Sequence, residues 1–198
     1  MGCCQVCDGA IGFGVQMNRP VAVAFGGRLG AGKSSISTAL AEDLGWKRVS
    51  FGDFVRSVAG TRGMQPSRQV LQDIGAELES EDAFAFCRNV LKAGGWYPGE
   101  SVVIDGIRHA RVLNILRELV APVPLFFVFL DAENRSREQR LYQRDSIDAE
   151  SLGVAELHST ERDVISVLPN LADLRLSNDH GSEAELVQHI ENELQMRP

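Results

Sequence analysis

Short apolar runs recur along the chain, separated by segments with helical periodicity. The runs lie at residues 21–25, 48–51, 102–104, 124–130 and 171–176, and each is followed directly by glycine or a polar residue. Apolar runs of this length are typical of strands that are buried on both faces of a parallel sheet. The pattern therefore predicts five strands whose ends carry polar side chains.

The intervening segments place apolar residues on one helical face. The sets with this spacing are Ile36, Leu40 and Leu44; Val112, Leu116 and Leu119; and Leu186, Val187, Ile190 and Leu194. Ser182 and Glu185 form a capping-box pattern that marks the start of the last helix. Alternating strands and helices form right-handed crossovers and a parallel sheet, with ligands at the carboxyl ends of the strands. We expect a three-layer α/β/α domain over residues 20–198.

The composition narrows the class of partner. The chain has 198 residues, of which 44% are hydrophobic, and a formal net charge of -7. Such an acidic chain lacks the basic footprint that polymeric nucleic acid requires. No apolar run approaches the roughly 20 residues of a membrane-spanning helix, and the beginning of the chain lacks a signal-peptide pattern. We therefore expect a cytoplasmic protein, a monomer or homodimer, that acts on a small molecule.

Residues 1–19 are predicted to form a flexible extension. Three cysteines lie close together in this extension. No second cysteine pair or nearby histidine supplies the fourth ligand that a metal site would need, so the sequence does not favour metal binding there. Val6 occupies the position at which a myristoylation signal carries Ser or Thr. Met17 opens a segment that runs directly into the first strand, so we expect residues 1–16 to be dispensable, and whether Met17 is the true start stays open. The role of the cysteines stays open; they are Cys3, Cys4 and Cys7.

A phosphate-binding loop follows the first predicted strand. Residues 27–34 fit the pattern G-x-x-x-x-G-K-[ST] in full and lie between a strand and a helix, which is the context that the motif requires. In such a loop the backbone N–H groups bind phosphate oxygens, Lys33 reaches the outer phosphates and the Ser34 hydroxyl binds Mg²⁺. The residues expected to bind ATP are Gly27, Arg28, Leu29, Gly30, Ala31, Gly32, Lys33, Ser34 and Ser35.

Polar side chains after the second and third predicted strands are candidates for binding the acceptor and the metal. Asp53 could accept a proton from the acceptor or orient it, and a helix N-cap is the alternative role. Arg56, about one helical turn later, could bind an acidic group of the acceptor. Asp105 ends the next strand as a Walker B carboxylate does, and we expect it to position Mg²⁺ through water. Arg108 lies just beyond it, as a second acceptor ligand or in a surface ion pair.

Three arginines follow the fourth predicted strand. Arg137, Arg140 and Arg144 fall on one helical face. Such a stripe is usually a solvated face, but beside a phosphate-binding loop forked guanidinium groups can clamp the transferring phosphoryl group. Residues 145–159, rich in Asp, Ser and Glu, are predicted to form a mobile loop or lid that brings Arg140 and Arg144 inward. The expected catalytic residues are Lys33, Asp53, Arg140 and Arg144.

These motifs together resemble those of the nucleoside monophosphate kinase group of P-loop proteins, from about residue 20 to the end of the chain. Residues 51–56 look like the Gly-Asp-x-x-Arg turn that opens the acceptor region of that group. Residues 67–77 are similar to the R-x-x-L-Q-x-x-G-x-E stretch of phage-type deoxynucleoside monophosphate kinases, and residues 158–161 are similar to their His-x-Ser-Glu element. The resemblance implies the strand order 2-3-1-4-5 and acceptor-binding helices over about residues 53–98.

The acceptor is less well defined than the donor. Residues 103–108 and Asn178 look equally like archaeal dephospho-CoA kinase-like proteins, and the Asp-Gly-Phe-Pro-Arg of adenylate kinases is absent. Arg111 lies where an acidic residue often follows in the relatives. We expect transfer of the γ-phosphoryl group of ATP to a nucleoside or deoxynucleoside monophosphate. The alternatives are a dephospho-CoA kinase-like enzyme and a regulatory protein that binds ATP without turnover; no Asn-Lys-x-Asp motif of a GTPase occurs.

Overall fold

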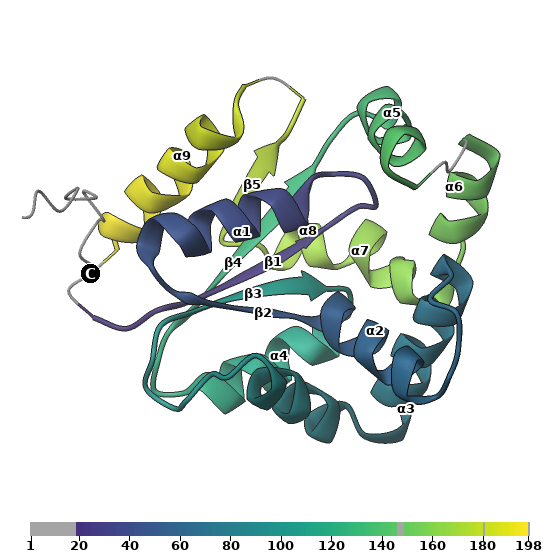
Figure 1. The fold of residues 1–198 in the computed structure, drawn as a ribbon. Helices are drawn as coiled ribbons and strands as arrows, with labels where there is room; N and C mark the ends of the chain where they lie inside the picture. Colours follow the sequence, from purple (N-terminus) through teal and green to yellow (C-terminus); the bar gives the residue numbers. More distant parts are fainter. Residues whose placement is uncertain (1–18, 146–148, 180, 198) are drawn as a thin grey trace, which may run out of the picture.

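The computed structural model describes residues 19–145, 149–179 and 181–197. A five-stranded parallel sheet runs through the middle of the molecule and carries helices on both faces (Figure 1). The predicted three-layer architecture and the implied strand order are confirmed, since the order is β2-β3-β1-β4-β5. The strands are β1 (Ala22–Gly27), β2 (Lys47–Ser50), β3 (Val102–Ile107), β4 (Leu125–Asp131) and β5 (Leu174–Ser177).

The helices divide between the two faces of the sheet. Helices α1 and α9 cover one face, and α2, α3, α4, α7 and α8 pack on the other (Figure 1). None of the helices in the described ranges is long and apolar enough to cross a membrane. Their bounds are α1 (Lys33–Leu44), α2 (Phe51–Thr61), α3 (Arg68–Ala93), α4 (Ala110–Val120), α5 (Asn134–Asp145), α6 (Ala149–Glu156), α7 (Arg162–Ser166), α8 (Leu168–Leu171) and α9 (Glu183–Gln195), with a 3-10 turn, η1, at Ser159–Glu161.

The central strand β1 serves both layers because successive side chains of a strand point to opposite faces. Val23 and Phe25 belong to the core formed with α1 and α9, whereas Ala22 and Ala24 belong to the core formed with α2, α3 and α4. All four side chains are completely buried. Since both faces of the sheet are covered, the carboxyl ends of the strands are where a ligand can reach residues of the central strands.

The predicted start of the last helix is confirmed. The Ser182 hydroxyl accepts a hydrogen bond from the Glu185 N–H at 3.2 Å, and the Glu185 carboxylate accepts one from the Ser182 N–H at 2.6 Å. The two residues thus form a capping box at the N-terminus of α9.

Two segments differ from the prediction. Residues 171–173, expected in the last strand, include the end of α8 and the turn that leads to β5, and the proline at the start of α8 favours a helical turn there. Most of the loop expected at residues 145–159 is the helix α6, which is anchored because Leu152 and Ala155 pack against Leu29 and Leu141. The predicted extension at residues 1–19, except its last residue, and residues 146–148 lie outside the described residues.

Candidate functional site

The loop between β1 and α1 passes close to two other strand ends. Gly27 has a φ of 147°, and a Cβ on it would lie 1.9 Å from the carbonyl oxygen of Leu130. Gly32 caps α1 with a φ of 88°, and a Cβ there would lie 2.3 Å from Nδ2 of Asn178. Both positions therefore require glycine. Because Gly32 provides no side-chain cap, the first N–H groups of α1 are left for an anion.

Lys33, the first residue of α1, folds back along this loop. Its ammonium group donates hydrogen bonds to the carbonyl oxygens of Gly27 at 2.7 Å and Arg28 at 2.8 Å. Lys33 also lines the cavity at the carboxyl edge of the sheet. Backbone carbonyls are neutral, so these two contacts orient the ammonium without cancelling its charge.

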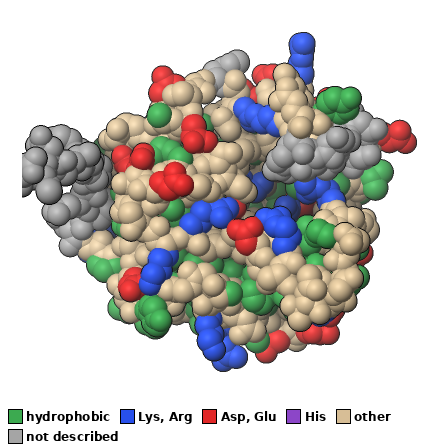
Figure 2. All heavy atoms as spheres, in the orientation of Figure 1, with side chains coloured by type: hydrophobic (Ala, Val, Ile, Leu, Met, Phe, Trp, Pro, Cys, Tyr) green, Lys and Arg blue, Asp and Glu red, His purple; other side chains and the backbone are tan. Residues whose placement is uncertain are grey.

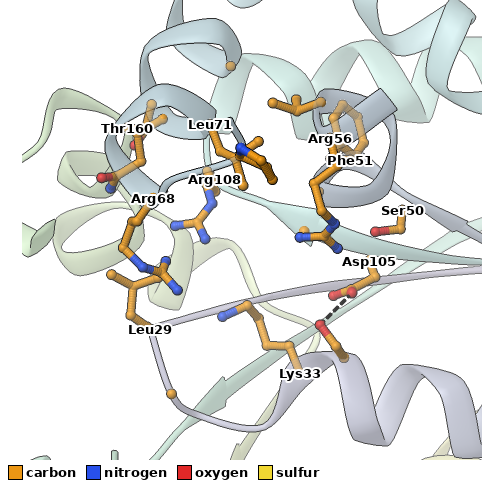
Figure 3. A pocket seen from close by; sticks show the side chains of 18 of the residues that line it. Leu29, Lys33, Ser50, Phe51, Arg56, Arg68, Leu71, Asp105, Arg108 and Thr160 are labelled. Carbon is orange, nitrogen blue, oxygen red and sulfur yellow. Dashed lines mark hydrogen bonds between the residues drawn. The ribbon is translucent and has the colours of Figure 1, made fainter. Parts of the chain in front are cut away.

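Ser34 and Asp105 meet where the loop passes the end of β3. The Ser34 hydroxyl donates a hydrogen bond to Oδ2 of Asp105 at 2.9 Å, the dashed line in Figure 3. Since the hydroxyl gives its hydrogen to the carboxylate, its oxygen lone pairs remain for a cation. Oδ1 of Asp105 is buried and has no hydrogen-bond partner among the described residues. A hydroxyl and a carboxylate are the hard oxygen donors that suit Mg²⁺, so these residues fit the expected ion.

Arg48 in β2 pairs with the same carboxylate, and the sequence analysis missed it. Nη2 of Arg48 donates to Oδ2 of Asp105 at 2.6 Å. Asp105 is only 3% exposed, and a carboxylate that is buried to this extent needs a compensating cation. The implied strand order places the strand of Arg48 beside that of Asp105. A charged residue in that strand was therefore the signal that could have identified the partner.

Asp53 lies in the first turn of α2, but it is not the N-cap of this helix. The cap is Ser50, whose hydroxyl accepts a hydrogen bond from the Asp53 N–H at 3.1 Å. The N-cap alternative for Asp53 is therefore wrong. The Asp53 carboxylate accepts hydrogen bonds from Arg48 at 3.2 Å and from Arg56 at 2.5 Å.

The charges around Asp53 favour its ionised form. Burial alone would raise the pKa of Asp53, but hydrogen bonds from Arg56 and Ser50 and the charges of Arg56 and Arg48 outweigh it, so the pKa lies below its usual value. Arg56 is one of the residues that line the cavity, and Asp53 is not among the described residues that do so. Asp53 is thus placed to orient Arg56, and the role of Asp53 in accepting a proton from the acceptor stays a prediction.

Arg108 lies in the cavity wall just beyond β3, with 29% of its side chain exposed. It donates a hydrogen bond to Glu161 of η1, whose side chain is buried. Desolvation by the surrounding protein, with a smaller effect of the Arg68 charge, lowers the pKa of Arg108 to about 10, so it stays charged at neutral pH. The resemblance had singled out residues 158–161, but nothing in the sequence indicated that Glu161 pairs with Arg108.

Arg137 and Arg140 of α5 have separate partners. Arg137 is 1% exposed and donates to the carbonyl oxygen of Leu29 at 3.1 Å and to Glu156 at 2.5 Å. Arg137 therefore stabilises the backbone of the phosphate-binding loop at Leu29. Arg140 lines the cavity and donates to the carbonyl oxygen of Asn178 at 2.5 Å. Arg144 is in α5, but its side chain lies outside the described part of the structure.

Glu156, the last residue of α6, joins this helix to the phosphate-binding loop. Its two carboxylate oxygens accept from Nη2 of Arg28 at 3.2 and 3.1 Å, in addition to the bond from Arg137. The preceding residue is held from the other side, because Gln72 of α3 donates to the carbonyl oxygen of Ala155 at 3.1 Å. Helix α6 thus bridges the loop and the helix α3.

The cavity at this edge has a volume of about 910 Å³. Four cationic residues labelled in Figure 3, Lys33, Arg56, Arg68 and Arg108, point into a shared space. Figure 2 shows Lys and Arg side chains gathered around a hollow in the surface. Asp105 is the one carboxylate among the described residues of its wall. An anion attached to an apolar or aromatic group fits such a wall. The cationic residues are Lys33, Arg56, Arg68, Arg108 and Arg140, and the large apolar ones include Phe51, Val55, Leu71, Phe86 and Val112.

Comparison with known proteins identifies the family. Residues 27–153 match the AAA domain family. A UPF0200 protein of Pyrobaculum aerophilum is 30% identical over 174 residues, which span 87% of this chain and 93% of that protein. This chain is a UPF0200-family protein with an AAA domain. A UPF0200 protein of Methanothrix thermoacetophila is 33% identical to it over 134 residues, 66% of this chain and 70% of that protein.

Solved structures of small-molecule kinases share the fold of this UPF0200 protein. The APS kinase of Mycobacterium tuberculosis, solved with AMPPNP and APS, has a TM-score of 0.59 at 21% identity, over 90% of this chain and 99% of that one. The shikimate kinase of Acinetobacter baumannii has a TM-score of 0.57 at 16% identity, over 86% of this chain and 90% of that one. Identities this low establish the fold alone, and the P-loop domain implies nucleotide binding.

The support that Arg137 gives to the loop is testable by unfolding. Replacing Arg137 with Met leaves the Leu29 carbonyl and part of Glu156 without a buried donor. We expect the free energy of unfolding to fall by about 2–4 kcal/mol. Arg135→Met, an exposed arginine of the same helix, is the matched control and should change it by less than about 0.5 kcal/mol. Equal urea midpoints for the two variants would contradict the assigned role.

Proposed function

We propose that this UPF0200 protein is an ATP-dependent kinase that transfers the γ-phosphoryl group to a nucleoside or deoxynucleoside monophosphate. The observation that carries the proposal is the cavity in which Lys33 of the phosphate-binding loop shares one space with Arg56 and Arg108 (Figure 3). Phosphoryl transfer leaves little covalent chemistry to the protein, so catalysis requires positioning and positive charge. The cavity wall offers both.

The loop and the N-terminus of α1 would bind the donor. Backbone N–H groups there suit the phosphates of ATP, and Lys33 would stabilise charge on the group in transfer. Mg²⁺, when bound at Ser34 and through water at Asp105, would neutralise phosphate oxygens. No group of three or more His, Cys, Asp or Glu side chains in the described part of the chain could hold a metal ion, so this ion would depend on phosphate ligands as well.

The two candidate classes of acceptor differ in whether the reaction needs a base. In the reaction an acceptor oxygen forms a bond to the γ-phosphorus while the bond to the β–γ bridging oxygen breaks. The oxygens of a monophosphate are already ionised near pH 7, whereas a hydroxyl must lose a proton to a base. Asp105 is the one carboxylate among the described residues of the wall, and it is committed to Ser34 and Arg48.

His109 also lines the wall, and its Nε2 is buried without a hydrogen-bond partner among the described residues. Burial lowers the pKa of His109, so a neutral imidazole is available there as a base. A monophosphate acceptor would need no such base, and its proposal rests on the cations of the wall.

One observation favours an acceptor that attacks through a hydroxyl group, such as dephospho-CoA. Glu161 already pairs with Arg108, so this arginine would offer less positive charge to a dianionic phosphate than an unpaired one. Arg56 is likewise paired with Asp53, although it is more than half exposed. This second candidate differs from the first in whether both arginines bind the acceptor directly.

An acceptor screen tests the proposal. ADP release would be followed by a coupled assay over nucleoside and deoxynucleoside monophosphates, dephospho-CoA, shikimate and gluconate. We expect turnover with at least one monophosphate and little with the hydroxyl acceptors. Turnover confined to dephospho-CoA would replace the first candidate with the second. ATP binding by calorimetry without turnover of any acceptor would instead favour a regulatory nucleotide-binding protein.

Lys33→Ala separates binding from transfer. The ammonium should matter most where charge develops on the transferring group, so kcat should fall by about 100-fold or more while the Kd for ATP rises much less. Calorimetry gives the affinity and the ADP-release assay gives kcat. A variant with wild-type turnover would show that the loop is not the catalytic centre.

Arg56 and Arg108 are predicted to bind one phosphate of the acceptor. Arg56→Ala and Arg108→Ala should each lower kcat/KM for the monophosphate by about 10- to 100-fold and leave the KM for ATP nearly unchanged, because the loop around Lys33 holds the donor. If both side chains contact the same phosphate, the losses should not add in the double variant.

Two further variants make this result interpretable. Since Arg108→Ala leaves Glu161 buried without its partner, the pair is also removed together as Arg108→Met with Glu161→Gln. Arg88→Ala, an exposed arginine of α3 that is not among the residues of the cavity wall, is the control for a general loss of charge. Weaker ATP binding with an unchanged acceptor KM would place either arginine on the donor side and remove the main support for a monophosphate acceptor.

A further inference from the structure

Arg48 contacts three separate elements with one guanidinium group. Its Nε donates to the Ser37 hydroxyl of α1 at 3.0 Å, its Nη2 to Asp105 of β3 at 2.6 Å, and its Nη1 to Asp53 of α2 at 3.2 Å. The side chain is largely buried by these neighbours. Arg48 is not among the described residues that line the cavity, so any effect on a substrate would pass through its partners.

Two of these partners lead into opposite halves of the site. Asp105 also accepts the hydrogen bond of Ser34, on the side where the residues fit a metal ion. Asp53 uses its other carboxylate oxygen, Oδ1, to accept from Arg56, which lines the acceptor side of the cavity. A continuous series of hydrogen bonds therefore runs from Ser34 through Asp105, Arg48 and Asp53 to Arg56.

The register of the sheet explains how one residue reaches both carboxylates. β2 pairs in parallel with β3, with Ser50 beside Asp105, and β2 continues directly into α2, whose first turn carries Asp53. Both carboxylates thus lie near the end of β2, one in the neighbouring strand and one in the helix that follows. The guanidinium group bonds to the two carboxylates through separate nitrogens in a fixed plane, whereas the three donors of a lysine ammonium share one nitrogen.

Asp53 and Arg56 are each more than half exposed. A long exposed side chain has many rotamers, and ordering it on ligand binding opposes the binding. The Arg48–Asp53 contact fixes the carboxylate to which Arg56 is bonded, so Arg56 is restricted before a ligand arrives. On the other side, the Arg48–Asp105 contact holds Oδ2 where Ser34 donates its hydrogen.

We propose that Arg48 is a positioning residue that fixes Asp105 on the metal side of the site and, through Asp53, Arg56 on the acceptor side. The kinetic part of this proposal rests on the proposed function, because it requires an acceptor that Arg56 binds. The structural part, which is the transmission from Arg48 through Asp53 to Arg56, stands without any turnover. The two parts are therefore tested by separate measurements.

The structural part is tested by NMR of the Arg56 side chain in the intact protein. The Nε–H resonance of Arg56 would be compared in the wild type, Arg48→Met, Asp53→Asn and the double variant. If Arg48 acts through Asp53, Arg48→Met should shift the Arg56 resonance and speed its solvent exchange, and it should have no further effect once Asp53 is Asn. An Arg56 signal unchanged by Arg48→Met, or equal additive shifts in the double variant, would overturn the proposal.

The kinetic part uses the acceptor found in the screen. Arg48→Met should lower kcat/KM for the acceptor by about tenfold. When Asp53 is already Asn, the same substitution should cause a smaller loss, because only the effect of Arg48 on Asp105 then remains. Arg48→Lys keeps the charge but should not restore the rate, because an ammonium cannot bond to both carboxylates in the same geometry. Full recovery by lysine would show that charge alone matters and would overturn the positioning role.

Arg62→Met is the matched control. Arg62 makes a two-bond ion pair with Glu77 that joins α2 to α3, both at 2.8 Å, but neither residue is among those of the cavity wall. Its loss should leave kcat/KM and the Arg56 resonance unchanged. Should Arg48→Met unfold, the same comparison is made with Arg48→Lys, for which an unchanged Arg56 resonance and rate would count against the proposal. If no acceptor is turned over in the screen but Arg48→Met still shifts the Arg56 resonance, the proposed function is contradicted. The positioning role of Arg48 is then still supported.

Discussion

A carboxylate buried at the edge of the sheet is the constraint on which the site depends. Removing the charge of Asp105 from water costs several kcal/mol unless partners compensate for it. Here the compensation comes from Arg48 of β2 and Ser34 of α1, which both donate to Oδ2. The two donors belong to different elements. The position of Asp105 therefore couples the phosphate-binding loop to the neighbouring strand, and through that strand to the first turn of α2.

Two of the cations in the cavity wall make hydrogen bonds to neutral backbone groups, while Arg56 and Arg108 are paired with carboxylates. Lys33 donates to the carbonyl oxygens of Gly27 and Arg28, and Arg140 to that of Asn178. These carbonyl contacts orient the two side chains, and a carbonyl group carries no full negative charge of its own. In a chain with a formal net charge of -7, this arrangement concentrates positive potential in one hollow, where it can attract an anionic ligand.

The parts of the molecule that were predictable from the sequence are those governed by local patterns. The apolar runs determine the strands because both sheet faces are buried, and the loop at residues 27–34 has steric requirements that only its glycines satisfy. The capping box of α9 was visible for the same reason, since both partners lie within one turn. What was missed depends on side chains that are distant in the chain. The sequence around Arg48 does not indicate that it pairs with Asp105, because the order of the strands in the sheet determines that pair. The sequence around Glu161 does not indicate that it pairs with Arg108, because that pair depends on where η1 packs in the folded chain.

Helix α6 shows how few apolar residues can determine an element in the folded protein. The polar composition of residues 145–159 favoured a loop, but Leu152 and Ala155 are buried against Leu29 of the phosphate-binding loop and Leu141 of α5. This small apolar contact is reinforced by the ion pairs of Glu156 with Arg28 and Arg137.

These contacts also constrain any opening of the predicted lid. Moving α6 away would expose its apolar contact with Leu29, separate Glu156 from Arg28, and break the bond from Gln72 to the Ala155 carbonyl. The first two contacts belong to the donor loop and the third to α3, so the position of α6 depends on both halves of the site. A ligand that displaced Arg28 would remove one of the two cations from Glu156 and so weaken the contacts that hold α6 in its present position. A lid that α6 forms is therefore coupled energetically to the phosphate-binding loop rather than moving independently of it.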